Sequence, residues 1–522
     1  MARVLLQVNM ARAPLLFAIV PHMTRALIAA LALSAAAVAG VRAQTPAAGT
    51  ARYEPSWESL DSRPAPAWYL DAKFGIFIHW GVYSVPAYSA PDQYAEWYWN
   101  ALRSTPSPSD AGALKRHEAT VAFHNRVFGK SFAYQQFAPM FQAELFQPDE
   151  WARIFKAAGA RYVVLTSKHH DGFCLFPSEQ ANRHWGQAWN AVDTGPRRDL
   201  LGDLSASVRK AGLKMGFYYS LYEWFNPLWL SDRALYVERH MIPQFKDVVT
   251  RYEPSIIFSD GEWDMPSSDW KSPELLAWLY NESPVRDEVI VNDRWGKETR
   301  HEHGGYFTTE YGAGLPDATH PWEENRGMGF SYGYNRNEPL SNYRTGKELV
   351  WMFADLVARG GNLLLNVGPT GDGRIPEVMQ DRLKEMGDWL AVNGEAIYGT
   401  RPWSRSAQWT SGTRPEQGFG EYKVKYDILE MAGQQPRNGQ AVKQVFFTKK
   451  PDALYAITPG WPGPTLVLSD VEPQGGSVVT MLGVTGALKW RQQGPDLVIE
   501  TPRLSVDQLP CRHAYTFKIT GI

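Results

Sequence analysis

Short apolar runs alternate with amphipathic stretches between about residues 65 and 400. The runs that predict buried strands are residues 74–79, 162–166, 214–219, 255–259, 289–292 and 362–367. The stretches with helical spacing are residues 148–158, 200–211, 234–252, 272–283, 345–359 and 376–393. This alternation predicts a parallel sheet with helices outside it. Because no Gly-rich nucleotide loop follows the first strand, the repeated units favour a (β/α)8-like TIM barrel over a doubly wound sheet.

The pattern changes after Arg401-Pro402-Trp403, where helical spacing stops. Short alternating runs follow, separated by Gly and Pro turns, at residues 441–448, 453–457, 465–468, 477–482, 497–500 and 514–519. Such runs predict a C-terminal antiparallel β-sandwich. We therefore expect a barrel domain over residues 52–402 and a sandwich over residues 403–522.

The first 43 residues differ in kind from the rest. They carry four arginines and no acidic residue, and an apolar run over residues 26–40 leads into Val41-Arg42-Ala43. A basic start, an apolar stretch and a small-x-small site predict a secretory signal peptide. The run is short for a stable membrane span. We expect an exported protein, periplasmic or extracellular, that starts at Met1 or at Met23.

Composition narrows the class of protein. The 522 residues carry a net charge of −2, and acidic and basic residues are interspersed. Without a basic stripe, nucleic acid is not an expected partner. Aromatic residues make up 13% of the chain, with 21 tryptophans. Such rings build large cores, and their faces also suit the apolar faces of sugars.

Polar side chains follow the predicted strands at the point where each strand ends. The catalytic residues of a parallel barrel lie at the carboxyl ends of its strands. We therefore expect the residues at these exits to meet in one site. The exits carry His79, Lys168 to Asp171, Tyr218 and Tyr219, Asp260, and Asn292 to Arg294.

Asp260 is the most informative of these residues. It ends an apolar strand, and Gly261 lets the chain turn away and leave the carboxylate clear. A retaining glycosidase needs one such carboxylate to attack the anomeric carbon and a second carboxyl group to protonate the leaving oxygen. His79, His169 and His170 lack both the i, i+4 pair and the cysteines of a zinc site, so we expect imidazoles that bind hydroxyl groups, with no metal or organic cofactor.

Several longer motifs occur in a fixed order. They read WYLDAKFGIFIHWG at 68–81, EWY at 96–98, KHHDGF at 168–173, NDRWG at 292–296, HGGY at 303–306 and NLLLNVGP at 362–369. In these motifs the chain resembles the α-L-fucosidases of glycoside hydrolase family 29, from about residue 52 to 522. In this family a Trp commonly stands where this chain has Phe258.

The resemblance implies a retaining mechanism with Asp260 as the nucleophile. It also implies that Tyr218, rather than Tyr219, belongs to the site. The residues implied to contact fucose are His79, Trp97, His169, His170, Tyr218 and Arg294.

The acid/base is the least determined residue, because the family places it on variable loops after the Arg294 strand. Glu310, in TTEYG, resembles one version of such a loop and is the first choice. Glu323, in HPWE, is the alternative, and Glu302 is the third candidate. For each of them the plain alternative is a solvated loop carboxylate.

The expected function is that of an exported retaining exo-α-L-fucosidase acting on fucosylated glycans or oligosaccharides. Three alternatives stay open from the sequence. They are another exo-glycosidase on the same barrel, a transfucosidase in which a sugar hydroxyl replaces water, and a catalytically inactive carbohydrate-binding protein. The sequence also leaves the oligomeric state and the fucosyl linkage open.

Overall fold

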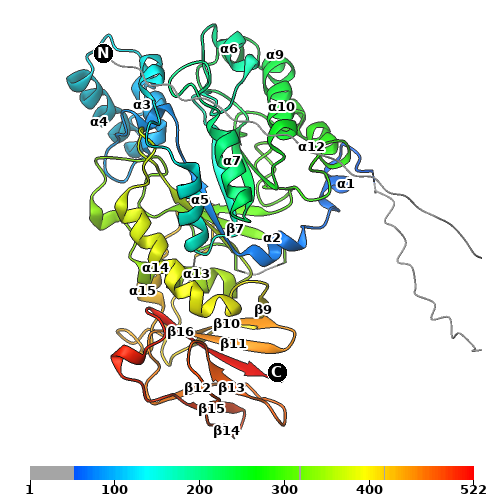
Figure 1. Ribbon diagram of the computed structural model, residues 1–522, viewed down its shortest axis with the longest axis vertical. Coiled ribbons are helices and arrows are strands. Elements are labelled where there is room, and N and C mark those ends of the chain that lie inside the picture. The colour runs from blue at the N-terminus through cyan, green and yellow to red at the C-terminus, as the bar shows by residue number, and fades with distance from the viewer. Residues whose placement is uncertain (1–51, 317–318, 417) are drawn as a thin grey trace, which may run out of the picture. The chain divides into compact units, whose positions relative to one another are not determined.

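The computed structural model describes residues 52–316, 319–416 and 418–522, and residues 52–522 form one compact unit (Figure 1). The predicted signal peptide, residues 1–43, lies outside the described residues. Across the described ranges, no helix has both the length and the apolar character to cross a membrane. The first eight strands are β1 (Phe74–Ile78), β2 (Tyr162–Lys168), β3 (Lys214–Ser220), β4 (Ile256–Asp260), β5 (Ile290–Val291), β6 (Phe307–Glu310), β7 (Trp322–Gly327) and β8 (Asn362–Val367).

These eight strands form one parallel sheet in the order β5-β4-β3-β2-β1-β8-β7-β6. The two edge strands are joined just before β6, where the backbone N–H groups of Gly305 and Tyr306 donate to the carbonyl of Val291 at 3.1 and 3.2 Å. The sheet therefore curls back on itself, and the predicted TIM-barrel-like fold is confirmed.

The described helices cover the sheet unevenly. No α-helix occurs in the described residues between β5 and β6 or between β6 and β7, where an ideal (β/α)8 barrel would have one. The α-helices are α1 (Trp57–Asp61), α2 (Ala67–Ala72), α3 (Tyr98–Arg103), α4 (Ala111–Val127), α5 (Pro148–Ala157), α6 (Glu179–Trp185), α7 (Leu200–Lys210), α8 (Pro227–Ser231), α9 (Arg233–Tyr236), α10 (Ile242–Tyr252), α11 (Ser267–Trp270), α12 (Ser272–Asn281), α13 (Gly346–Ala358), α14 (Glu377–Asn393) and α15 (Ile428–Met431).

The strands β6 and β7 correct the sequence prediction, which placed Glu310 and Glu323 on loops. Both residues lie on strands of the barrel. Strand β7 reads WEENRG and is buried along its whole length. Glu323 and Glu324 accept hydrogen bonds from neighbouring side chains, and Asn325 lines the cavity described below, so the strand is buried without an apolar run that would signal it.

The C-terminal region contains two antiparallel sheets, β13-β16-β11-β10-β9 and β12-β15-β14. Side chains from both sheets, including Phe447, Leu466 and Ile499, share one hydrophobic core, so the predicted β-sandwich is confirmed. The strands are β9 (Arg401–Trp409), β10 (Lys443–Lys450), β11 (Ala453–Pro459), β12 (Thr465–Leu468), β13 (Val479–Met481), β14 (Trp490–Gln493), β15 (Asp496–Glu500) and β16 (Ala514–Thr520). The boundary between residues 402 and 403 stays a prediction.

The sandwich packs on helices α13 and α14. The indole N–H of Trp351 donates to the carbonyl of His513 at 2.8 Å, and that of Trp389 donates to the carbonyl of Ala514 at 2.9 Å. Beside them, buried Asp355 on α13 pairs with Lys443 on β10 at 2.7 Å. A buried ion pair thus links the barrel to the sandwich beside these indole contacts.

Candidate active site

A cavity of about 670 Å³ opens at the carboxyl ends of the barrel strands. It collects residues that lie far apart in the sequence, as the parallel topology requires. The structure brings together every residue predicted for the catalytic and sugar-binding roles, apart from the alternative acid/base. The residues brought together are His79, Trp97, His169, His170, Tyr218, Asp260, Arg294 and Glu310.

Asp260, the last residue of β4, lines this cavity with 8% of its surface exposed. The hydroxyl of Tyr218 donates to its Oδ2 at 2.8 Å, and Nη1 of Arg294 donates to its Oδ1 at 3.0 Å. Burial alone would raise the pKa of this carboxyl group, but Arg294 and the neighbouring His170 and Arg300 outweigh burial and hold it at about 2. Asp260 is therefore an oriented, ionised carboxylate over the whole physiological pH range.

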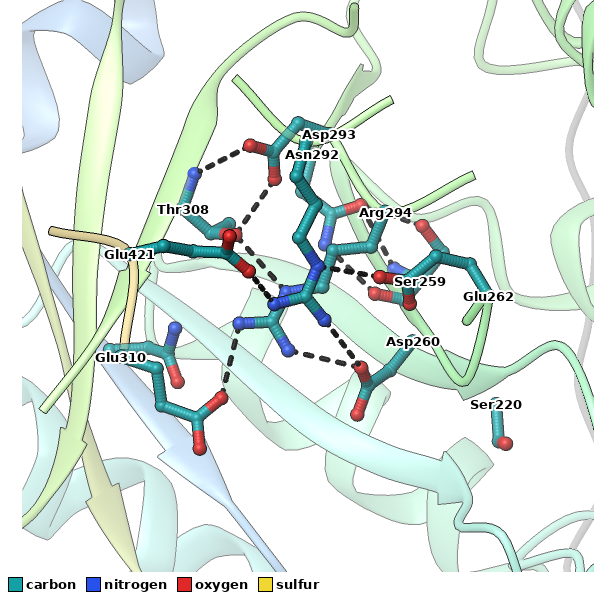
Figure 2. Close-up of polar contacts among 12 residues, drawn as sticks. Ser220, Ser259, Asp260, Glu262, Asn292, Asp293, Arg294, Thr308, Glu310 and Glu421 are labelled. Carbon is teal, nitrogen blue, oxygen red and sulfur yellow. Dashed lines mark hydrogen bonds and ion pairs between the residues drawn. The ribbon is translucent and has the colours of Figure 1, made fainter. Parts of the chain in front are cut away.

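Glu310 ends β6 and faces the same cavity. Nη2 of Arg294 donates to its Oε2 at 3.2 Å, and the hydroxyl of Tyr94 donates to its Oε1 at 3.2 Å. The two carboxylates are thus bonded to two nitrogens of one guanidinium, and Figure 2 shows Asp260 and Glu310 on either side of it. This arrangement places a second carboxyl group next to the first.

The residues around Arg294 explain why the chain folds this way locally (Figure 2). Thr308 on β6 accepts from Nε of Arg294 at 3.1 Å, and its own hydroxyl donates to Asp293 at 2.7 Å. Asn292 accepts from the N–H and the hydroxyl of Ser259 at 3.1 and 2.7 Å, and so fixes the residue before Asp260. Each residue of the Asn-Asp-Arg motif therefore has its own positioning contact.

Gly261 is required by space and by backbone conformation. Its φ angle is +76°, in the left-handed region that favours glycine. A Cβ atom at this position would lie 2.4 Å from the ring of Tyr222. The sequence prediction that Gly261 turns the chain away from the Asp260 carboxylate agrees with this geometry.

The histidines of the cavity are buried and neutral. Burial lowers the pKa of His79 to about 3 and that of His170 to about 4, and it lowers the pKa of His169 well below its usual value. Because Asn366 donates its amide N–H to Tyr332, its oxygen accepts from Nδ1 of His79 at 2.8 Å. The Nε2 atom of His79 is then an acceptor.

The other two histidines differ in their partners. Ser220 donates its hydroxyl to a backbone carbonyl and therefore accepts from Nδ1 of His170 at 2.6 Å. Nδ1 of His169 is buried and has no hydrogen-bond partner in the described residues. Buried polar atoms are rarely left unpaired, so this atom is suited to a polar ligand.

The alternative acid/base lies elsewhere. Glu323 is fully buried near the start of β7 and does not line the cavity. In the sheet it sits two residues below Asn325, the partner of Glu310, which corresponds to roughly 6–7 Å along the strand. Its Oε2 accepts from Tyr69 and Tyr162. Glu302 is exposed and also lies outside the lining of this cavity.

Sequence reasoning missed two charged residues beside the nucleophile, Glu262 and Arg300. Nε of Arg300 donates to Oε1 of Glu262 at 2.5 Å, and Nη2 lies 3.8 Å from Asp260. Burial raises the pKa of Glu262 to about 7 against the opposing charge of Arg300. Glu262 could have been predicted as a site residue, because it lies only two positions after Asp260. Arg300 lies on an irregular segment whose sequence carries no comparable signal.

Further lining residues carried no role in the prediction. Glu96 was quoted only within a motif, yet it is buried, accepts from the N–H of Gly333 at 2.8 Å, and has its pKa raised by burial to about 7. The others without a predicted role include Tyr94, Trp263, Asn325, Tyr332, Glu421 and Tyr422. No group of three or more His, Cys, Asp or Glu side chains in the described parts of the chain is arranged to hold a metal ion.

Comparison with known proteins identifies relatives over nearly the whole chain. The family model described as alpha-L-fucosidase matches residues 41–395, and the model of the alpha-L-fucosidase C-terminal domain matches residues 437–520. The tissue alpha-L-fucosidase of Homo sapiens is 40% identical over 510 residues, which cover 95% of this chain and 97% of the relative. An alpha-L-fucosidase of Dictyostelium discoideum is 48% identical over 361 residues, covering 67% of this chain and 75% of the relative.

Solved structures that resemble this chain are also those of alpha-fucosidases. The crystal structure of the Thermotoga maritima alpha-fucosidase superposes with a TM-score of 0.70 at 36% identity, covering 90% of this chain and 100% of that one. A complex of the same Thermotoga maritima enzyme with fucose superposes with a TM-score of 0.69 at 34% identity, again covering 90% and 100%. The fold is therefore shared with these proteins.

Proposed function

The chain belongs to the α-L-fucosidase family, and on that premise we propose that it is a retaining exo-glycosidase that removes terminal α-L-fucosyl residues from glycans. The observation that carries the proposal is the pair of carboxylates, Asp260 and Glu310, bonded to one guanidinium inside one cavity. Retention requires two carboxyl groups about 5–5.5 Å apart on either side of the scissile bond. A pair that shares a single guanidinium is closely spaced, as this mechanism needs.

In the first step, an oxygen of Asp260 attacks C1 of the fucosyl residue. The bond from C1 to the glycosidic oxygen breaks, and Glu310, which enters this step protonated, gives its proton to that oxygen. Asp260 is suited to this role because it is ionised and because Tyr218 and Arg294 orient its two oxygens. The product of this step is a covalent fucosyl-enzyme ester.

In the second step, Glu310, now ionised, removes a proton from water. The water oxygen attacks C1, the ester bond to Asp260 breaks, and fucose leaves with its configuration retained. Acid–base assistance of this kind contributes about 10²–10⁴-fold to the rate.

The buried imidazoles bind the hydroxyl groups of the sugar. A neutral imidazole can both accept and donate, which suits hydroxyls. Nε2 of His79 accepts, the unpaired Nδ1 of His169 adds a further polar contact, and Arg294 adds a charged donor. Trp97, which packs edge-to-face on His170, provides an apolar surface for the C5 methyl group of the fucosyl residue.

Export to the periplasm or the outside of the cell is part of the proposal and rests on the sequence of residues 1–43. Mass spectrometry of the protein recovered from its native host tests it. A mature chain beginning near residue 44 is expected, and an intact N-terminus in the cytosolic fraction would contradict export.

Hydrolysis of nitrophenyl α-L-fucoside, compared with the α- and β-galactosides, tests the sugar and the reaction. Asp260→Gly is expected to be nearly inactive, with azide restoring turnover as the β-fucosyl azide. Glu310→Ala is expected to yield the α-azide, because azide then attacks the fucosyl-enzyme. A wild type that cleaves a galactoside and ignores the fucoside would overturn the sugar assignment.

Glu323→Gln is the matched control for the acid/base. This substitution changes a carboxyl group of the same barrel that does not line the cavity. We expect it to retain activity. If Glu310→Ala is fully active and Glu323→Gln is inactive, the acid/base is Glu323.

A further inference from the structure

A segment from beyond the barrel lies along the outer edge of β6. The backbone N–H of Glu310 donates to the carbonyl of Glu421 at 2.7 Å, and the N–H of Lys423 donates to the carbonyl of Glu310 at 2.9 Å. Glu310 and Tyr422 thereby form a parallel bridge. The backbone of the proposed acid/base is therefore held by a segment more than a hundred residues further along the chain.

The side chain of Tyr422 lies beside the Glu310 carboxylate. Its hydroxyl is 3.1 Å from the hydroxyl of Tyr94, which donates to Oε1 of Glu310. Because the one proton of Tyr94 is used in that bond, Tyr422 donates to Tyr94. A single intervening hydroxyl thus separates Tyr422 from the group that protonates the leaving oxygen.

The interior of the cavity is buried, and its exposed lining residues include aromatic side chains. The residues placed around the terminal sugar, such as His79 and Asp260, are buried. The exposed aromatic rings in the described lining are Trp263 at 38% and Tyr422 at 48% exposure. In an exo-acting pocket the leaving part of the substrate extends outward from the acid, so it reaches the mouth on the side of Tyr422.

Two further contacts hold the Tyr422 segment in place. The ammonium group of Lys423 lies 4.8 Å from the ring centroid, within reach of a cation–π contact. The neighbouring Glu421 is bonded to Arg300, which anchors this segment to the residues beside the nucleophile. The segment is thus attached to the barrel, while about half of the surface of Tyr422 stays exposed to solvent.

We propose that Tyr422 forms the subsite for the leaving group by stacking on the apolar face of the pyranose to which the fucosyl residue is attached. The inference rests on the proposed function and adds the residue that binds the leaving part of the substrate. An aromatic ring with a polar edge matches a pyranose, which has an apolar face and a rim of hydroxyls. A simple fluoride leaving group makes no such contact.

The test compares two kinds of substrate in the full-length protein. One is α-L-fucosyl fluoride, and the other is the best substrate among the α-(1→2)-, (1→3)-, (1→4)- and (1→6)-linked fucosyl disaccharides. For Tyr422→Ala we expect kcat/KM on the disaccharide to fall about tenfold or more, with less than about a threefold change on the fluoride. Tyr422→Phe keeps the ring and loses only the hydroxyl that donates to Tyr94, so its loss on the disaccharide should be clearly smaller than that of Tyr422→Ala.

Phe419→Ala is the matched control, because Phe419 is an exposed ring on the same segment that does not line the cavity. It should leave both values unchanged. If Tyr422→Ala fails to fold, Tyr422→Leu removes the flat ring at similar size. An equal loss on both substrates, or no loss on the disaccharide, would overturn the subsite while leaving the proposed function intact. A wild type that cleaves neither substrate would overturn the proposed function itself.

Discussion

Asp260 and Glu310 are bonded to different nitrogens of the same guanidinium, at 3.0 Å through Nη1 and 3.2 Å through Nη2 of Arg294. The guanidinium is planar and always charged, so its single positive charge offsets one negative charge of the pair and its geometry sets the relative position of the two carboxyl groups. Thr308 and Asp293 hold the guanidinium in turn. The spacing between the proposed nucleophile and acid is therefore built into a rigid group rather than into two flexible side chains.

Arg294→Lys keeps the positive charge but loses the planar guanidinium whose nitrogens contact Asp260 and Glu310. One ammonium group cannot bond both carboxylates in this geometry, and the loss of a charge-assisted hydrogen bond costs about 1.5–3 kcal/mol. We expect kcat on nitrophenyl α-L-fucoside to fall about 10- to 100-fold. Arg300→Lys, at the longer distance of 3.8 Å from Asp260, should cost less. A wild-type kcat in Arg294→Lys would rule out this role for the guanidinium.

Tyr218→Phe removes the hydroxyl that donates to Asp260 at 2.8 Å. The nucleophile then loses one of its two orienting hydrogen bonds, and kcat should fall about tenfold. Tyr219→Phe is the matched control, because the hydroxyl of Tyr219 instead bonds Gln244 away from the cavity at 2.8 Å. Steady-state kinetics of both variants distinguish them, and equal losses would argue against a specific role for Tyr218.

Glu323→Gln should change how stability depends on pH. Burial raises the pKa of Glu323 to about 8 in the folded state, above the ordinary value of about 4.3 in the unfolded state. The folded state therefore binds the extra proton, and stability is lost as pH rises between about 4.5 and 8. The variant should remove a slope of about 1.4 kcal/mol per pH unit in that window.

Urea unfolding of wild type and Glu323→Gln at pH 5, 6, 7 and 8 measures this slope. Other buried carboxyl groups with raised pKa, such as Glu96 and Glu324, contribute equally to both proteins and cancel in the difference. Parallel stability curves for the two proteins would show that Glu323 does not titrate as described.

Asp355→Ala should destabilise the contact between the barrel and the sandwich. Asp355 is buried, bonds Lys443 at 2.7 Å and Arg359 at 3.1 Å, and accepts from Tyr426 at 2.7 Å. Its removal leaves two buried cations without their anion, which costs about 3–5 kcal/mol. Asp388→Ala, which breaks a surface pair with Lys384, should cost under about 1 kcal/mol. Denaturant unfolding compares the two, and similar losses would contradict the buried-pair account.

Several site residues could be predicted because their signals are local. His79, His169 and Asp260 directly follow or end apolar runs, and a parallel sheet brings the carboxyl ends of its strands to one edge. The role of Gly261 could be predicted for the same reason, because the turn it makes involves only neighbouring backbone. The resemblance to the α-L-fucosidase family added Trp97 and the choice of Tyr218.

Other residues could not be placed from local signals. Strand β7 carries polar side chains on a fully buried strand, so its sequence has no period that separates it from a loop. Tyr422 belongs to a segment that the sequence assigned to the sandwich region, yet it lines the cavity of the barrel. Such contacts join residues more than a hundred positions apart and leave no pattern along the chain.

The sequence by itself determined the barrel strands with apolar runs, the sandwich and the polar strand ends, because each depends on periodicity within a few residues. Only the tertiary structure decided between Glu310 and Glu323 as neighbours of Asp260. The two glutamates lie on adjacent strands, and a register difference of two residues puts one in the cavity and buries the other beneath it. Register between strands is fixed by backbone pairing and packing across the whole barrel, so no single stretch of sequence records it.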